Sequence, residues 1–427
     1  MKLQRHREAR GASLIEYTLI MMAVGAIAVL VLGIVGSRLS GSLGGVSAGF
    51  GQSGTSNGVT NGGMQMAPAV GIGHHLPAPV GITTPKPIGS GGSVPTPTPT
   101  STSTPTPTPT PVPGSVKPEL AGLVDRQGAP SAAEAPDLSG WVVNVTWAEL
   151  QPTAGTTITS DNPIDQAIAQ VDQNPAYRGM HLRIRVMAGI DSPNWVEAMS
   201  GGPVYVYNTQ DQVGGDVPRF WTAPVEQAYA NLQVLLAAKY DSDPEIEDVN
   251  MSGCMTVYAE PLIREITSSE TVTDLLAAGY TEAADQSCQE DQINAQAVWV
   301  HTHSSIALNP YDVINANGSV SVDEAFTATL INYCRTTLGE RCTLGNDSIR
   351  STSLGSAYDD MYNSIAGAGP GIYFQTAQAA KVGNLQTTIQ WAIDEGSNDV
   401  ELPAGWSSLI TSAQMAQDNQ ALLANQQ

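Results

Sequence analysis

Basic residues are scarce in this sequence of 427 residues. There are 18 Lys and Arg residues against 40 Asp and Glu, a net charge of -22, and four of the basic residues fall within the first eleven positions. A protein that binds nucleic acid needs a basic surface to neutralise phosphates. The composition therefore argues against a nucleic-acid partner for the acidic remainder of the chain.

Motifs for cofactors and metals are also missing. The chain has no Gly-x-Gly-x-x-Gly segment, which weakens a dinucleotide-binding interpretation. It has no Cys-x-x-Cys pair or Cys/His spacing of the kind that holds zinc. His301 and His303 resemble half of a metal site but lack partners at useful spacing. We expect no metal and no cofactor.

The first forty residues combine a basic leader with a long apolar run. The apolar stretch from Tyr17 to Gly36 has about the ~20 residues that a helix needs to cross a bilayer. The basic flank should stay in the cytoplasm, so the rest of the chain faces outward. No small-x-small cleavage site follows the apolar stretch, which argues against an ordinary secretory signal.

The segment at the head of this run, Gly-Ala-Ser-Leu-Ile-Glu-Tyr, resembles the processing site of type IV prepilins, and closely that of the Flp family. The resemblance implies that a prepilin peptidase cuts between Gly11 and Ala12. Glu16 and Tyr17 then occupy the family positions, and Glu16 would pair with the new N-terminal amine of a neighbouring pilin subunit. Flp pilins normally end soon after this helix, whereas this chain continues for hundreds of residues.

A linker is expected between the membrane and the rest of the chain. Val94–Gly114 alternates Thr and Pro, and proline fixes φ and removes a hydrogen-bond donor. Such a segment is an extended spacer of about 60 Å at ~3.1 Å per residue. The expected organisation is a leader at 1–11, a pilin-like transmembrane helix at 12–40, a disordered linker at 41–114, and a domain at 115–427 displayed at the cell surface.

Cysteine usage fits an exported chain, because an even number permits disulfides. The four cysteines are Cys254, Cys288, Cys334 and Cys342. Pairing of the first two and of the last two would give two bridges, and four buried thiols would fit the sequence equally well.

Residues 115–427 alternate between strand and helix patterns, which predicts a (β/α)8 TIM-like barrel. Strands are expected at 120–125, 141–147, 181–187, 246–251, 305–308, 342–349, 371–376 and 399–402. Helices are expected at 163–171, 223–240, 273–299, 322–338, 385–395 and 407–425. A Rossmann-like open sheet is the structural competitor.

Three segments resemble the beta-galactosidase-like (β/α)8 clan of glycoside hydrolases. They are Trp147–Pro152, Leu182–Trp195 and Tyr258–Pro261. In that clan the acid/base glutamate follows the fourth strand, and Glu260 is the matching position. The clan's nucleophile follows the seventh strand, where this chain has Gln375, and an amide cannot act as a carboxylate nucleophile.

Glycoside hydrolysis needs a second carboxylate. Glu401 after the last strand, or Asp347 acting as a base, would supply it; otherwise the barrel binds sugar without cutting it. The other residues predicted to bind substrate are Trp147, Arg185, Trp195, Trp221, Asn309, Asn346 and Gln375, although each tryptophan fits a hydrophobic core equally well. The sequence thus predicts a surface-displayed, glycoside-hydrolase-like protein that acts on or binds extracellular polysaccharide. A minor pilin or adhesin is the alternative.

Overall fold

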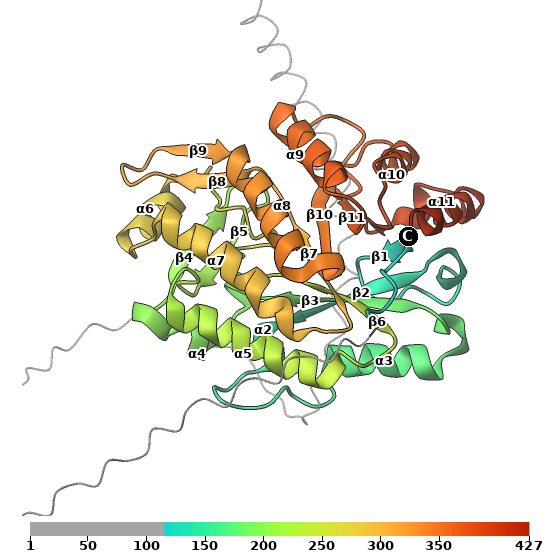
Figure 1. The fold of residues 1–427 in the computed structure, drawn as a ribbon, viewed down its shortest axis with the longest axis horizontal. Helices are drawn as coiled ribbons and strands as arrows, with labels where there is room; N and C mark the ends of the chain where they lie inside the picture. Colours follow the sequence, from blue (N-terminus) through green and yellow to red (C-terminus); the bar gives the residue numbers. More distant parts are fainter. Residues whose placement is uncertain (1–114, 427) are drawn as a thin grey trace, which may run out of the picture. The chain divides into compact units, whose positions relative to one another are not determined.

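The computed structural model describes residues 115–426, in which eight parallel strands close into a barrel (Figure 1). The order around the barrel is β1-β12-β11-β10-β7-β6-β3-β2. The strands are β1 (Gly122–Asp125), β2 (Gly140–Thr146), β3 (His181–Met187), β6 (Ile246–Asn250), β7 (His303–Ala307), β10 (Cys342–Ile349), β11 (Ile372–Thr376) and β12 (Asp399–Leu402). The predicted barrel is confirmed for this part of the chain, and the open sheet is excluded.

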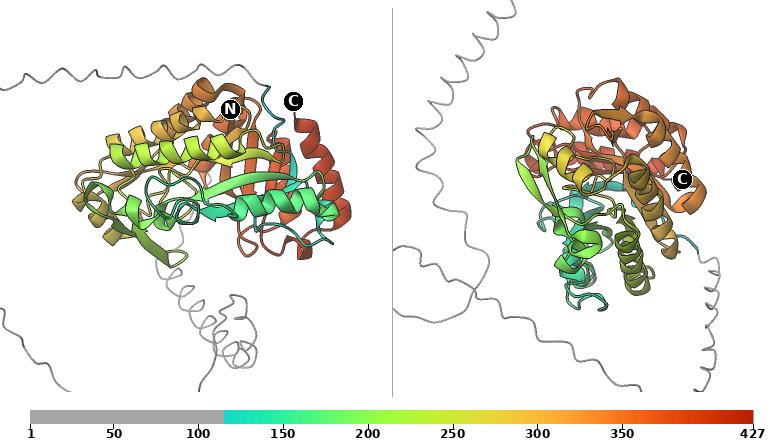
Figure 2. Two further views of the ribbon diagram at one scale, coloured as in Figure 1. Left: turned by 90° about the horizontal axis from the view of Figure 1, so that it is seen from below. Right: turned by 90° about the vertical axis from the view of Figure 1, so that its left-hand side faces the viewer.

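Helices surround the barrel on its outside (Figure 2). The long ones are α3 (Pro163–Gln173), α5 (Ala223–Tyr240), α6 (Ser269–Ala277), α7 (Glu282–Ala295), α8 (Glu324–Leu338), α9 (Ser356–Gly367), α10 (Leu385–Asp394) and α11 (Ser412–Asn425). Two single turns, α2 (Trp147–Leu150) and α4 (Asn194–Glu197), follow β2 and β3. Because helices cover the strands, the strands are buried along most of their length, as in parallel sheets generally.

Capping residues correct several predicted helix boundaries. The helix expected at 273–299 is two helices, because Gly279 has a φ of +88° and the Thr281 side chain accepts a hydrogen bond from the Ala284 N–H at the start of α7. The helix expected from 322 begins at Glu324 behind the cap residue Asp323. Likewise, the last helix begins at Ser412, where Thr411 forms a capping box.

Two β-hairpins and one helix were not predicted. The hairpins are β4 (Val204–Asn208) with β5 (Val213–Val217), and β8 (Tyr311–Ile314) with β9 (Val320–Asp323). Helix α9 follows β10. The hairpins are insertions and so fall outside a simple β-then-α pattern, whereas α9 occupies the regular place of a helix between β10 and β11.

The barrel interior is charged. Arg183 is fully buried, and its guanidinium lies 2.9 Å from Asp248, 2.8 Å from Asp399 and 2.8 Å from Glu401. Buried charges are tolerated only when they are paired and hydrogen-bonded. The apolar side chains of the strands instead pack outward against the helices, where most of the hydrophobic core lies.

The cysteines form two disulfides, Cys254–Cys288 and Cys334–Cys342, so the alternative of four thiols does not hold. The leader, transmembrane helix and linker predicted for 1–114 lie outside the described residues. Between residues 115 and 426, no helix combines the length and hydropathy required to cross a membrane.

Candidate active site

A cavity of about 830 Å³ opens at the carboxyl ends of the barrel strands. This is the end at which barrels of this architecture carry their functional residues. Residues that lie in or follow the barrel strands line it: Arg126, Asn144, Arg185, Glu260, Asn309, Asp347 and Gln375. Most of these side chains are polar, so the cavity offers hydrogen-bond partners beside its apolar surface.

Glu260 lies in the loop after β6 and is half-buried, with its side chain lining the cavity. The Asn309 Nδ2 donates a hydrogen bond of 3.1 Å to its Oε1. Burial raises the pKa of Glu260 to about 7, and the nearby Asp347 carboxylate contributes to the rise. A carboxyl group with such a pKa is partly protonated at neutral pH and can act as a general acid.

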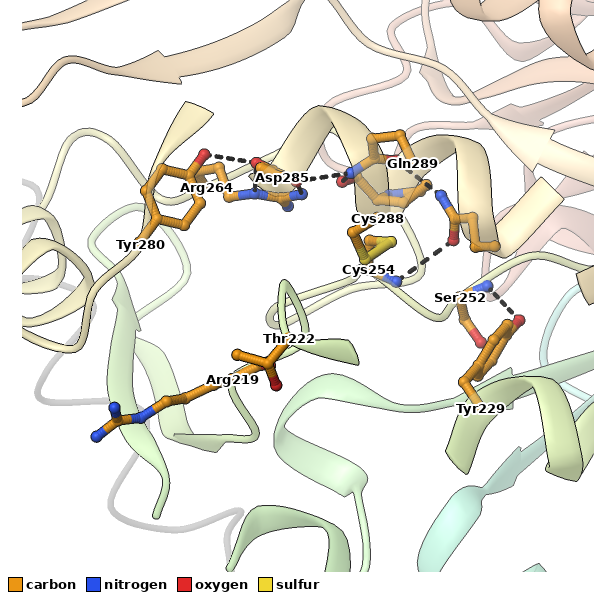
Figure 3. The surroundings of a disulfide bond; sticks show 12 residues. Arg219, Thr222, Tyr229, Ser252, Cys254, Arg264, Tyr280, Asp285, Cys288 and Gln289 are labelled. Atoms are coloured by element: carbon orange, nitrogen blue, oxygen red, sulfur yellow. Dashed lines mark hydrogen bonds and ion pairs between the residues drawn. A yellow bond between two sulfur atoms is a disulfide. The ribbon is translucent and has the colours of Figure 1, made fainter. Parts of the chain in front are cut away.

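The loop that carries Glu260 is fixed on both sides to α7 (Figure 3). Before Glu260, the disulfide joins Cys254 to Cys288. After it, Arg264 donates hydrogen bonds of 2.6 Å and 2.5 Å to the two carboxylate oxygens of Asp285. A site carried on a loop needs such support to hold its geometry.

Asp347, near the end of β10, lines the same cavity as Glu260. The Tyr373 hydroxyl donates a hydrogen bond of 2.9 Å to its Oδ1, and Arg185 Nη2 lies 3.5 Å from its Oδ2. Burial raises the pKa of Asp347 to about 6, although Arg185 acts in the opposite direction. Asp347 therefore lies in the same cavity as Glu260 with a raised pKa, and its role as the second carboxylate stays a prediction.

Gln375, in β11, is held between Asp347 and Arg185. Its Nε2 donates to the Asp347 carbonyl oxygen at 2.8 Å, and its Oε1 accepts from Arg185 Nη1 at 3.1 Å. The side chain reaches the cavity but is a neutral amide. The position on the seventh barrel strand thus carries no nucleophile.

Glu401 does not line the cavity, although the sequence predicted it there as a second carboxylate. It is fully buried inside β12 and accepts hydrogen bonds from Arg183 at 2.8 Å and from Arg185 at 2.8 and 2.9 Å. Burial opposes ionisation, but Arg185 and Arg183 outweigh it and lower the pKa of Glu401. Within residues 115–426 it is a counter-ion of the barrel interior and does not line the cavity.

Three further predicted residues, Arg185, Asn309 and Gln375, line the cavity, and Asn346 lies behind them. Asn346 is fully buried, and its Nδ2 donates to the Asn309 side-chain oxygen at 3.2 Å. It therefore positions Asn309, which in turn contacts Glu260. The sequence prediction that Asn346 itself binds substrate needs this correction.

The three predicted tryptophans pack into the protein and do not line the cavity. Trp147 and Trp195 stack edge to face with ring centres 6.0 Å apart. Trp221 packs in the same way against Phe220 and Tyr280. Their role is core packing in place of the predicted stacking on sugar. Trp147 and Trp195 lie in the helical turns that follow β2 and β3, and Trp221 directly precedes α5.

Several cavity residues were missed by sequence reasoning. Asp211, in the turn of the β4–β5 hairpin, pairs with Lys381 at 3.0 Å and accepts a hydrogen bond of 3.1 Å from the Tyr258 hydroxyl. The other missed residues are Arg126, Glu265, Asp312, Arg350 and Tyr358. Arg126 and Arg350 directly follow β1 and β10, so the strand-end rule that found Glu260 could also have found them.

Comparisons with known proteins establish no family for the chain. No family model and no curated protein sequence matches it. Solved structures that resemble it include a beta-galactosidase from the psychrophilic Marinomonas ef1, with 12% identity, a TM-score of 0.41, and coverage of 71% of this chain and 59% of that one. An endo-beta-1,4-glucanase from Xanthomonas axonopodis pv. citri has 11% identity and a TM-score of 0.41, with coverage of 71% and 99%.

An endo-glycoceramidase II from Rhodococcus sp. has 12% identity and a TM-score of 0.39, with coverage of 68% of this chain and 76% of that one. The match to the beta-galactosidase covers 59% of that protein, which is less than two thirds of its length. Likenesses at these identities and TM-scores do not assign an activity to this chain.

Proposed function

We propose that residues 115–427 form a glycoside-hydrolase-like domain whose cavity takes extracellular polysaccharide, with Glu260 as the general acid. The observation that carries the proposal is Glu260 itself. It lies in the loop after the fourth barrel strand, β6, lines the cavity, and has a pKa raised to about 7 by burial and by Asp347. Asparagine, glutamine and arginine side chains around it offer partners for sugar hydroxyl groups.

The chemistry proposed is hydrolysis with inversion. Protonated Glu260 gives its proton to the oxygen of the scissile bond, while Asp347 takes a proton from a water molecule that attacks the anomeric carbon. The glycosidic C–O bond breaks as the new C–O bond forms, and the leaving sugar departs as an alcohol. A covalent glycosyl-enzyme is not part of the proposal, because Gln375 stands at the nucleophile position.

A second candidate is a sugar-binding barrel without turnover, as in an adhesin or a minor pilin. Two observations favour it. Gln375 is an amide fixed at both ends, and Asp347 is engaged by Tyr373 and Arg185 before any substrate is present. In this alternative, Glu260 and Asp347 would bind hydroxyl groups of the sugar and would neither donate a proton to the glycosidic oxygen nor take one from water.

The experiment that separates the two measures both turnover and binding. The full-length chain, purified in detergent, is assayed on a panel of aryl glycosides and polysaccharides beside Glu260→Gln, with the exposed Glu270→Gln as a matched control. Hydrolysis that falls about 100-fold or more in Glu260→Gln alone supports the enzyme. Equal binding without turnover in all three proteins supports the adhesin, and full hydrolysis by Glu260→Gln contradicts the role given to Glu260.

The N-terminus is proposed to hold this domain at the cell surface through a pilin-like helix at 12–40 and the linker at 41–114. The support is the motif around Gly11, Glu16 and Tyr17 and the apolar stretch that follows it. Cleavage by a prepilin peptidase would remove residues 1–11. Gly11→Leu should block cleavage, and mass spectrometry of the chain from a host with the peptidase checks this. A wild-type chain that keeps its leader in that host would contradict the proposal.

A further inference from the structure

The cavity holds a large share of the domain's basic residues. Residues 115–426 contain twelve Lys and Arg residues and 38 Asp and Glu residues. One-twelfth of all residues in this range line the cavity. Four of the twelve basic residues are among them, namely Arg126, Arg185, Arg350 and Lys381. Five of the 38 acidic residues line it, where an even share would be about three. The enrichment is therefore strongest for positive charge.

Two of these arginines lie at adjoining strand ends on the barrel rim. Arg126 follows β1, and its Nη1 donates a hydrogen bond of 2.6 Å to the carbonyl oxygen of Thr376, the last residue of β11. Thr376 pairs in register with Ile349, and Arg350 is the next residue after Ile349. Both arginines thus lie over the adjoining ends of β10 and β11, beside Gln375.

Neither Arg126 nor Arg350 has a carboxylate within 4.0 Å in the part of the chain that the structure describes. Arg126 bonds to a carbonyl oxygen, and Arg350 bonds to the backbone and side chain of Ser348 at 3.2 and 2.6 Å. By contrast, Lys381 is paired with Asp211. The positive charge of the two arginines is therefore not neutralised locally.

The neighbouring Arg185 also lines the cavity, and its Nε is enclosed by protein atoms without a hydrogen-bond partner among the described residues. Burial lowers the pKa of Arg126 and Arg185 adds to this, although Glu401, Asp347 and Asp125 act in the opposite direction from beyond ion-pair distance. A partly buried guanidinium without a counter-ion is unfavourable, and an anionic group placed beside it would relieve that cost.

We propose that Arg126 and Arg350 form an anion subsite, so that the cavity selects an acidic glycan. The inference rests on the proposed carbohydrate function and names its substrate class. The group bound is a carboxylate or a sulfate on a sugar, because the planar fork of a guanidinium matches both. Glu265 and Asp312, which line the cavity from the loop after β6 and from β8, would disfavour a second anion there and so fix the orientation of the glycan.

Calorimetric titration of the full-length chain in detergent tests the proposal with three probes of equal length: oligogalacturonate, a sulfated galactan oligomer and a neutral galactan oligomer. At least one acidic oligomer should bind about tenfold more tightly than the neutral one, and Arg126→Gln and Arg350→Gln should each weaken that binding about tenfold. Both variants should lose much less affinity for the neutral oligomer, because an arginine offers that oligomer only a hydrogen bond to a hydroxyl group. The exposed Arg178→Gln removes the same charge elsewhere and should change nothing.

The choice between the two acidic oligomers identifies carboxylate or sulfate as the bound group. Equal affinity for acidic and neutral oligomers, or unchanged acidic binding in both variants, would overturn the anion subsite and leave the carbohydrate function standing. If no oligomer binds, both the anion subsite and the proposed carbohydrate function are contradicted. If Arg126→Gln fails to fold, Arg350→Lys decides the matter, since it keeps the charge without the fork and should lose only part of the affinity.

Discussion

Two glutamates in this molecule, one inside the barrel and one in its cavity, carry the same chemical group into different environments. Glu401 lies in the barrel interior between Arg183 and Arg185, which hold its pKa below the ordinary value despite burial. Glu260 faces the cavity with an amide partner, and burial and Asp347 raise its pKa to about 7. The first is therefore a permanent anion with a structural role, and the second is a group that can exchange a proton near neutral pH.

Breaking the interior network should have the largest effect. Arg183→Met would leave three carboxyl groups, those of Asp248, Asp399 and Glu401, without their shared cation. Removing one partner from a buried ion pair costs about 3–5 kcal/mol, so we expect a loss of that order in the free energy of unfolding. Denaturant-induced unfolding measures it, with the exposed Arg178→Met as control. A loss no larger than that of the control would show that the network is not structural.

A smaller effect is expected for the cavity glutamate, and it should depend on pH. The pKa of Glu260 is raised from an ordinary 4.5 to about 7, first by burial and then by Asp347. Stability from this group is thus fully present below about 4.5 and is lost as the pH rises through about 7. The Glu260→Gln variant has no such ionisable group. The difference between its free energy of unfolding and that of the wild type should therefore increase from about pH 4.5 to about pH 7 and stay constant at higher pH.

Denaturation of both proteins across that range checks the prediction. The exposed Glu270→Gln should keep a constant difference from wild type over the same range. A constant difference for Glu260→Gln as well would show that the pKa of Glu260 is not raised in the folded protein.

The sequence located five residues of this cavity because one rule of the fold is visible in it. Parallel strands end at the same side of a barrel, so polar residues near predicted strand ends were expected to meet, and Glu260, Asn309, Asp347 and Gln375 do. The rule failed for Glu401, because it lies within β12, and the depth of a residue in a strand is set by register with its neighbours.

Other features depended on tertiary packing and had no local signal. Trp147 would suit either a sugar platform or a core, and only the position of its neighbours places it against Trp195. The β4–β5 hairpin brings Asp211 to Lys381 across 170 positions of sequence, a contact that no local pattern encodes. Arg126 and Arg350 directly follow β1 and β10, so the strand-end rule does encode their position, although the sequence prediction did not include them.

The most direct test of the account is the pH dependence of glycan hydrolysis by the full-length chain and by Glu260→Gln. The account predicts turnover in the wild type that declines as the pH rises through about 7, because Glu260 then loses the proton that it must donate, and little turnover in the variant at any pH. Turnover that stays high well above that pH, or that survives in Glu260→Gln, would contradict it.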